Sequence, residues 1–372
     1  MTHPIDLMGL RLKNPIMTAS GPWAGDAAGI QRCIDAGAAA VITETISLEA
    51  KPRISPRLFT DDKGLFNIML YSRMHLEEWE LEFSNIDRKD SKLICSIWGA
   101  TASEIAYLAK KVQQMGADAI EISISAPIGS RNLRMLKPST DIREFMKAAV
   151  NAVDIPVMTK LSYEAASSPE FLHELELAGI RAVSAIDALK GLVGVDIENR
   201  LTLMPTYGGY TGQHIRPVSL ATTAALQQYT PLQVVSSGGV LDHKTVLEFL
   251  MLGATAVQLA SAILCNGYEI IADVVRDLDR WLTEHDHMNV DAIRGSALPS
   301  LRAFEDIIPK SLYASLKEKC CRTECSICIQ NCLRDAISYD KSGTISIDPD
   351  QCDGCGLCVE RCPHGLVTLE WR

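Results

Sequence analysis

The sequence predicts an α/β protein in which a barrel of eight parallel strands, each followed by a helix, precedes a small cysteine-rich domain. Short apolar runs recur eight times between residues 15 and 263, and segments with helical apolar spacing separate most of them. Such alternation indicates a parallel sheet covered by helices, and eight units in about 280 residues fit a (β/α)8 TIM barrel. An open doubly wound sheet is the alternative, although no predicted strand leads into the G-x-G-x-x-G turn of a dinucleotide-binding sheet.

The predicted strands are apolar along most of their length, as strands buried on both faces must be. They span residues 15–20, 39–45, 93–99, 119–125, 156–162, 181–187, 232–237 and 256–263. Helical spacing that ends in glycine is clearest at 103–116, 169–179 and 242–253.

Three predicted loops, 47–67, 126–138 and 188–217, are longer than barrel turns need. They follow the second, fourth and sixth strands, at the end where barrel enzymes form their active sites. We therefore expect these loops to carry function.

Some strand ends carry residue types that suit a flat, anionic cofactor. Gly238-Gly239 follows the seventh strand and lets backbone N–H groups approach an anion, in a part of the barrel that commonly binds phosphate. Lys160 lies within an apolar strand, where an ammonium group needs an anionic partner. The small residues at 19–21 would let a flat group lie against the backbone. A plain turn and a lysine that reaches solvent at the barrel rim are the alternatives for the first two features.

The C-terminal part of the chain holds nine of the twelve cysteines. A C-x2-C-x2-C-x3-C-P motif begins at Cys352, and a C-x3-C-x2-C-x3-C motif begins at Cys321. A shift of thirty residues brings the last three cysteines of one motif onto those of the other, which indicates an internal duplication. This pattern is typical of bacterial ferredoxins with two [4Fe–4S] clusters, in which the fourth cysteine of each motif binds the other cluster. Zinc sites usually use two short pairs of ligands, and disulfides need an oxidising compartment.

The eight predicted cluster ligands divide into two sets. One set is Cys321, Cys325, Cys328 and Cys362, and the other is Cys352, Cys355, Cys358 and Cys332. Cys320 competes with Cys321 for one position, and the sequence leaves that choice open. The remaining cysteines, Cys33, Cys95 and Cys265, lie among apolar residues and are expected to be reduced thiols.

Composition limits the class of protein. The 372 residues are 47% hydrophobic, which supports a sizeable core, and the net charge of −10 argues against nucleic acid as a partner. No apolar run is long enough for a membrane span, and no signal peptide is evident, so we expect a cytoplasmic protein. The predicted domains are a barrel at 1–310, with a helical linker at about 273–319, and a ferredoxin-like α+β domain at 311–372.

The barrel resembles the dihydroorotate dehydrogenase family and, within it, the flavin–iron–sulfur half of dihydropyrimidine dehydrogenase. Nine stretches carry the resemblance and span the whole barrel in order. They are Asn14–Gly21, Ser55–Phe59, Phe66–Ile68, Gly116–Ser125, Thr159–Ser162, Gly191–Gly194, Tyr207–Pro217, Ser236–Val240 and Leu252–Ile263. The resemblance implies FMN bound above the barrel, and two iron–sulfur clusters in the tail.

Carried over by position, the resemblance also implies roles for individual residues. The flavin would lie along Ala19, Ser20 and Gly21, with Lys160 near its N1 side. The phosphate would lie among Gly209, Gly238, Gly239 and Ser261. A flavin suits the tail, because flavins exchange hydride equivalents for single electrons.

The sequence departs from this family around the substrate. The family's N-L-S-C-P loop, whose cysteine transfers a proton, reads Ser123-Ile124-Ser125-Ala126-Pro127 here. The family's lysine at the second strand is Glu44, and an asparagine after the sixth strand is Asp187, whereas Asn67 is kept. Since asparagine amides read pyrimidines, we expect an altered substrate, either cationic or rich in hydrogen-bond donors. A Glu44 paired with Arg57 or Arg73 is the alternative.

Another group must then handle protons. The candidates are Glu44, Ser125, Ser130, Tyr71, His75 and Tyr163, with Glu44 first because a carboxyl group in a dry pocket can act as a general acid. Asn67, Ser123 and Asp187 are the expected substrate-binding residues.

We therefore expect an FMN- and iron–sulfur-dependent oxidoreductase that acts on a C=C or C=N bond of a small, unsaturated, cyclic substrate. Its electrons would pass through the clusters to or from a ferredoxin or an NAD(P)-dependent flavoprotein subunit, and the chain could form a homodimer as family members do. The alternative is an electron-transfer subunit of a larger complex, with a vestigial substrate pocket.

Overall fold

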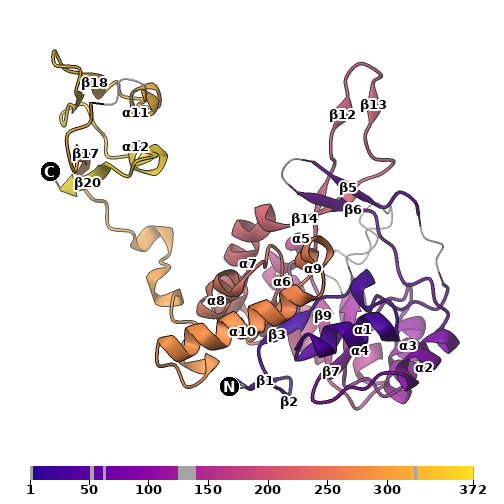
Figure 1. Ribbon diagram of the computed structural model, residues 1–372. Helices are drawn as coiled ribbons and strands as arrows, with labels where there is room; N and C mark the ends of the chain where they lie inside the picture. The colour runs from indigo at the N-terminus through magenta and orange to yellow at the C-terminus, as the bar shows by residue number, and fades with distance from the viewer. Residues whose placement is uncertain (1–2, 51–53, 62–63, 125–139, 322–324, 372) are drawn as a thin grey trace. The chain divides into compact units, whose positions relative to one another are not determined.

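The computed structural model describes residues 3–50, 54–61, 64–124, 140–321 and 325–371. The chain divides into two units, Met1–Ser300 and Leu301–Arg372 (Figure 1). The predicted boundary at residue 310 therefore lies inside the second unit. In the described part of the chain, no helix has the length and apolar character that crossing a membrane requires.

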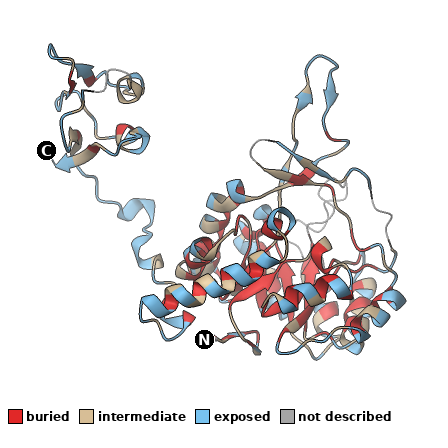
Figure 2. Ribbon diagram, in the orientation of Figure 1, coloured by how far each residue is buried: buried red, intermediate tan, exposed pale blue. Residues whose placement is uncertain are grey.

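A closed barrel of eight parallel strands forms the first unit, in the order β10-β15-β16-β3-β4-β7-β8-β9. All eight predicted strands and the barrel itself are confirmed. The strands are β3 (Ile16–Thr18), β4 (Ala40–Ile42), β7 (Lys92–Ile97), β8 (Ala119–Ser123), β9 (Val157–Lys160), β10 (Ala182–Ala185), β15 (Gln233–Ser236) and β16 (Ala256–Leu259). Nearly every strand residue is buried, as Figure 2 shows, which explains why these runs are apolar throughout.

Ten helices accompany the described strands of this unit, and the three helices predicted at 103–116, 169–179 and 242–253 correspond to α3, α6 and α8. The helices are α1 (Ala27–Asp35), α2 (Leu76–Ser84), α3 (Ala102–Gln114), α4 (Thr140–Val150), α5 (Tyr163–Ala166), α6 (Pro169–Ala178), α7 (Arg216–Tyr229), α8 (His243–Met251), α9 (Ser261–Asn266) and α10 (Glu269–Glu284). Side chains of Asp26, Thr101, Ser168 and Asp242 cap the N-termini of α1, α3, α6 and α8. Short 3-10 turns occur at Pro22–Ala24, Gln213–Ile215, Val290–Ala292, Leu298–Ser300 and Phe304–Asp306.

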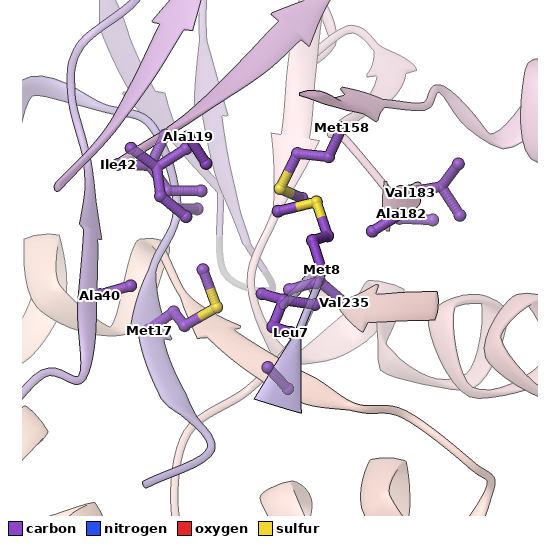
Figure 3. Close-up of a cluster of buried hydrophobic side chains, with 14 of the residues drawn as sticks. Leu7, Met8, Met17, Ala40, Ile42, Ala119, Met158, Ala182, Val183 and Val235 are labelled. Carbon is purple, nitrogen blue, oxygen red and sulfur yellow. The ribbon is translucent and has the colours of Figure 1, made fainter. Parts of the chain in front are cut away.

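An N-terminal hairpin closes the end of the barrel at which the strands begin. It consists of β1 (Ile5–Leu7) and β2 (Leu10–Leu12). Leu7 and Met8 lie among Met17, Met158 and Val235 in the core (Figure 3). The opposite end, where the strands finish, is thereby left for the site.

Over that opposite end lies a second, antiparallel sheet of four strands, which we call the cap sheet. Its order is β11 (Leu189–Gly191), β14 (Gly208–Thr211), β6 (Leu65–Asn67) and β5 (Leu58–Thr60). The Phe66 and Tyr210 rings lie 4.7 Å apart, and Met204 packs in the same apolar cluster. A two-stranded hairpin, β12 (Val195–Asp196) and β13 (Leu201–Thr202), extends from the connection between β11 and β14.

The second unit contains two antiparallel strand pairs and two short helices. The pairs are β17 (Leu312–Leu316) with β20 (Val367–Trp371), and β18 (Ile337–Tyr339) with β19 (Ile345–Ile347). The helices are α11 (Ile327–Gln330) and α12 (Leu357–Arg361). Its small core combines Ala314, Ile337, Ile345 and Val367 with several cysteines.

Candidate active site and thiol clusters

A cavity of about 380 Å³ lies at the ends of the barrel strands, a size common for small-molecule sites. It brings together eight residues that the sequence nominated for catalysis, substrate or cofactor. They are Ser20, Gly21, Glu44, Asn67, Ser123, Lys160, Asp187 and Ser261. Strand ends supply most of them, and β6 of the cap sheet supplies Asn67.

A smaller cavity of about 50 Å³ lies beside the first, and Lys160, Asp187 and Ser261 line both. Other predicted cofactor residues line the smaller cavity, namely Ala19, Gly238 and Gly239. The two cavities together therefore bring seven of the eight predicted cofactor positions to one site.

The Gly238-Gly239 pair has a conformation that other residues rarely adopt, with φ of 104° and 82°. A Cβ atom on Gly239 would lie 2.6 Å from Cβ and 2.9 Å from Cα of Arg216, at the start of α7. Glycine is required here because the turn passes against the helix backbone. Such a turn exposes backbone N–H groups, which is what a phosphate site needs.

Lys160 ends β9 and points into the cavity, where its Nζ lies 3.3 Å from Oδ1 of Asp187 and 3.3 Å from Oγ of Ser20. Its burial by itself lowers the pKa of the lysine, but its interactions with neighbouring acidic groups, Asp187 first, outweigh that effect and raise the pKa. The anionic partner predicted for Lys160 is therefore Asp187. The lysine is 8% exposed, so the alternative of a solvent-facing lysine is wrong.

Glu121, which the sequence reading missed, lies on β8 inside the barrel and is fully buried. It accepts hydrogen bonds from Ser184 Oγ at 2.6 Å and from Gln258 Nε2 at 3.4 Å. Burial raises the pKa of Glu121, and nearby Lys160 opposes this effect only in part. We therefore treat Glu121 as a neutral acid and Lys160–Asp187 as the ion pair. An ionisable residue in an apolar run, the signal that singled out Lys160, could also have found Glu121.

Glu44 and Ser123 lie on the walls of the larger cavity. Glu44 is 7% exposed, and its backbone N–H donates to the Ala24 carbonyl at 2.9 Å. Its Oε2 lies 3.1 Å from the place where a Cβ on Gly25 would stand, so the carboxylate packs against the turn after β3. Ser123 pairs with Lys160 in the β8–β9 register, which brings the two side chains to the same rim.

Not every nominated residue reaches the site. Gly209 lies within β14 of the cap sheet, where its carbonyl accepts a hydrogen bond from Asn67 Nδ2 at 3.2 Å, and it lines neither cavity. Tyr71 stacks on Trp98 with ring centroids 4.5 Å apart, also away from the lining. The exposed His75 precedes α2, and the exposed Tyr163 begins α5. Ser125 and Ser130 lie outside the described residues.

Some lining residues were not nominated. Trp23 stands over the turn at Gly21 and donates from Nε1 to the Ala19 carbonyl at 2.8 Å, which holds the small residues in place. Thr211 and Gln258 line the cofactor side. Gln258 could have been found from the sequence, because it is a polar residue within an apolar strand. Thr211 could not, because its position in the cavity depends on how the cap sheet folds.

The cysteines of the second unit gather around its two short helices. Cys328 lies on α11 and Cys358 lies on α12, so each short helix carries the third cysteine of one motif. Both cysteines also pack in the core of the unit. The two motifs therefore place equivalent cysteines on the two helices.

Backbone N–H groups also approach the sulfur atoms in equivalent pairs. Ala336 N–H donates to Cys332 Sγ at 3.3 Å, and Leu366 N–H donates to Cys362 Sγ at 3.4 Å. Within the described residues, no three His, Cys, Asp or Glu side chains converge as a single metal ion would require. The thiolates of an iron–sulfur cluster are spread more widely than the ligands of one metal ion, because each binds a different iron.

Comparison with known proteins identifies both units. Residues 4–282 match the family described as dihydroorotate dehydrogenase, and residues 345–368 match the one described as a 4Fe-4S binding domain. The catalytic subunit of dihydroorotate dehydrogenase B (NAD(+)) from Pyrococcus abyssi is 30% identical over 297 residues, which are 79% of this chain and 98% of that protein.

Proteins with the same name from Thermococcus kodakarensis and Methanothermobacter thermautotrophicus are 31% and 29% identical over 301 and 296 residues. These alignments cover 79% and 78% of this chain and 97% of each relative. The chain therefore belongs to the dihydroorotate dehydrogenase family, as a flavin- and iron–sulfur-containing oxidoreductase that acts on CH–CH groups.

Proposed function

We propose that the two adjoining cavities hold FMN, with its phosphate at the Gly238-Gly239 turn and Ser261, and its ring system along Ala19–Gly21. The positive φ angles of the glycine pair and the buried ammonium of Lys160 support this assignment. A bound FMN supplies the exchange between a hydride equivalent and single electrons. The contribution of Lys160 is a positive charge, held in place by Asp187 and Ser20, beside the flavin.

Two [4Fe–4S] clusters are proposed for the second unit, since it contains two four-cysteine motifs and each motif places one cysteine on a short helix. The module would pass single electrons between the flavin and a partner. The relatives' name, catalytic subunit with NAD(+), supports a separate NAD-dependent flavoprotein subunit in that role, and a ferredoxin is the second candidate.

The substrate is proposed to be a small, unsaturated, cyclic compound that differs from dihydroorotate and uracil. The cavity wall carries two acidic residues, Glu44 and Asp187, where the family's lysine and asparagine are expected. A substrate that donates hydrogen bonds, or that carries positive charge, is complementary to such a wall.

Proton transfer is proposed to fall to Glu44, because Ala126 cannot perform it and Glu44 lines the cavity. A carboxyl group can both hold and accept a proton at its oxygen atoms. Ser125 and Ser130 remain candidates from the sequence. Asn67, on the cap sheet, and Ser123, at the end of β8, are proposed to orient the substrate.

Another possibility is an electron-transfer subunit with a vestigial pocket. The replacement of the family's cysteine by Ala126 favours it. The cavity of about 380 Å³, whose lining still includes Asn67, Ser123 and Asp187, favours the enzyme.

The test uses the anaerobically purified, photoreduced protein, which is mixed with a panel of unsaturated heterocycles and enoyl compounds. The enzyme hypothesis predicts rapid flavin reoxidation by at least one of them, and at least 100-fold slower reoxidation in Glu44→Gln, as loss of a general acid entails. Glu77→Gln, at an exposed position of α2, is the control. Uracil turnover at the highest rate in the panel would contradict the altered substrate. Reoxidation by one-electron acceptors alone would favour the electron carrier.

A further inference from the structure

The first cysteine motif has an ambiguity that the duplication does not resolve. The thirty-residue shift pairs Cys325 with Cys355, and it pairs the next two cysteines likewise, but it places Cys352 opposite position 322, which is arginine. Both Cys320 and Cys321 precede that position. Spacing alone therefore leaves two candidates for the thiolate that corresponds to Cys352.

Packing distinguishes the two candidates. Cysteines of the second motif that pack in the apolar core of the unit are Cys352, Cys358 and Cys362, whereas Cys355 is exposed and lies outside it. In the first motif, the cysteines in that core are Cys320, Cys328 and Cys332. The equivalents of Cys358 and Cys362 are thus present, and Cys320 takes the place of Cys352.

A backbone hydrogen bond and the exposure of the side chains also distinguish Cys320 from Cys321. The Cys320 carbonyl accepts a hydrogen bond from Ile345 N–H at 2.8 Å, which fixes this residue beside the start of β19. Cys321 is exposed, and its Sγ lies 3.7 Å from Oγ1 of Thr344.

We infer that Cys320, and not Cys321, is the fourth thiolate of the set formed with Cys325, Cys328 and Cys362. This inference rests on the two-cluster arrangement proposed above and corrects the ligand set expected from the sequence. Cys321 is then an exposed thiol that binds no iron.

The experiment compares Cys320→Ala and Cys321→Ala in the full chain, purified anaerobically, by iron and sulfide analysis and by electron paramagnetic resonance of the reduced protein. The wild type is expected to contain about eight irons, as two [4Fe–4S] clusters require. Cys320→Ala is expected to lose roughly one to four of these irons and the magnetic coupling between the clusters. Cys321→Ala is expected to match the wild type.

Loss of iron in Cys321→Ala, or full iron content in both variants, would overturn the inference. A wild type with only about four irons would instead contradict the two-cluster proposal itself. If Cys320→Ala does not fold, alkylation of the wild-type holoprotein decides the question. Tandem mass spectrometry should then find Cys321 labelled and Cys320 protected, and the reverse pattern would sink the assignment.

Discussion

The floor and the roof of the catalytic cavity are built in different ways. The floor comes from barrel strand ends and the turns directly after them, such as Lys160 at the end of β9 and Gly238-Gly239 after β15. The roof is the cap sheet, whose central strands β6 and β14 are joined by pairs such as Asn67 with Gly209, far apart in the chain. Floor residues keep the types expected for a flavin, whereas the altered residues face the space between floor and roof.

This difference separates two tasks that one cavity performs. Cofactor contacts depend on short segments whose positions the barrel fixes, so few substitutions are compatible with them. The cap sheet depends on contacts among strands of three or four residues and one apolar cluster around Phe66. Changes in the floor should therefore alter flavin binding, and changes in the roof should leave it intact.

The largest effect is expected for Lys160→Met. The change leaves Asp187 in the cavity without the ammonium group that now lies 3.3 Å away. Removal of one member of a buried ion pair costs about 3–5 kcal/mol, so the variant should lose that much free energy of unfolding, together with its FMN. Urea denaturation and flavin content measure both losses.

A second variant serves as the control for this pair. Lys160→Met combined with Asp187→Asn should recover at least about 1 kcal/mol of the lost stability, because no carboxylate remains opposite the methionine. FMN binding should stay weak, since the cation is still absent. Equal stability of the single and double variants would show that the two side chains are not coupled.

In the floor, Gly239→Ala is expected to weaken FMN binding about tenfold or more, because positive φ and the contact with Arg216 both oppose a Cβ atom. Gly9→Ala provides a matched control. Gly9 has φ of 84° but nothing within 4 Å of an added Cβ. Gly9→Ala should lower the temperature of thermal unfolding through the same backbone strain. It should leave the FMN dissociation constant, measured by fluorescence titration, unchanged.

In the roof, Phe66→Ala should loosen the cap sheet, since the ring is buried against Tyr210 and such truncations cost about 3–5 kcal/mol. Limited proteolysis should become about tenfold faster within the cap, because local opening becomes easier, while FMN content stays at the wild-type level. Leu203→Ala, on the exposed hairpin, should change neither quantity. A loss of FMN from Phe66→Ala would end the division between floor and roof.

The smallest effect concerns Glu121, whose pKa is raised by burial inside the barrel. A carboxyl group with a raised folded pKa binds its proton more tightly when folded, so its contribution to stability is complete below the unfolded pKa and declines as pH rises above it. Glu121→Gln should therefore leave the free energy of unfolding nearly unchanged at about pH 4.5 and raise it by about 1 kcal/mol at pH 8. Urea denaturation at both values tests this, and a variant less stable at pH 8 would contradict a neutral Glu121.

The barrel was predictable because its signals are local. Each strand is an apolar run closed by turn residues, so all eight were located from the sequence. Lys160 and Gly238-Gly239 were found by the same reasoning, since each is unusual for the strand or turn that contains it. The cap sheet escaped prediction, because β5 and β6 are three residues each and become recognisable as strands only when they pair with each other and β6 pairs with β14.

Contacts between distant segments account for the other differences. Asp187 was nominated for substrate, and the structure also makes it the partner of Lys160. Gly209 was nominated by position in a motif, yet its backbone is used within the cap sheet. The choice between Cys320 and Cys321 depends on which side chain faces the core of the unit, and sequence spacing carries no information on that direction.

Each of the two insertions that form the cap sheet connects two adjacent barrel strands: one lies between β4 and β7, and the other between β10 and β15. The lengths and sequences of these insertions can therefore change without altering the register of the barrel strands. Such an exchange must be made in pairs, because Phe66 comes from one insertion and Tyr210 from the other. Substrate specificity should therefore be transferable from a relative in a chimera that receives both segments together, but not in one that receives either segment alone. The electron-transfer domain would be unchanged in such a chimera.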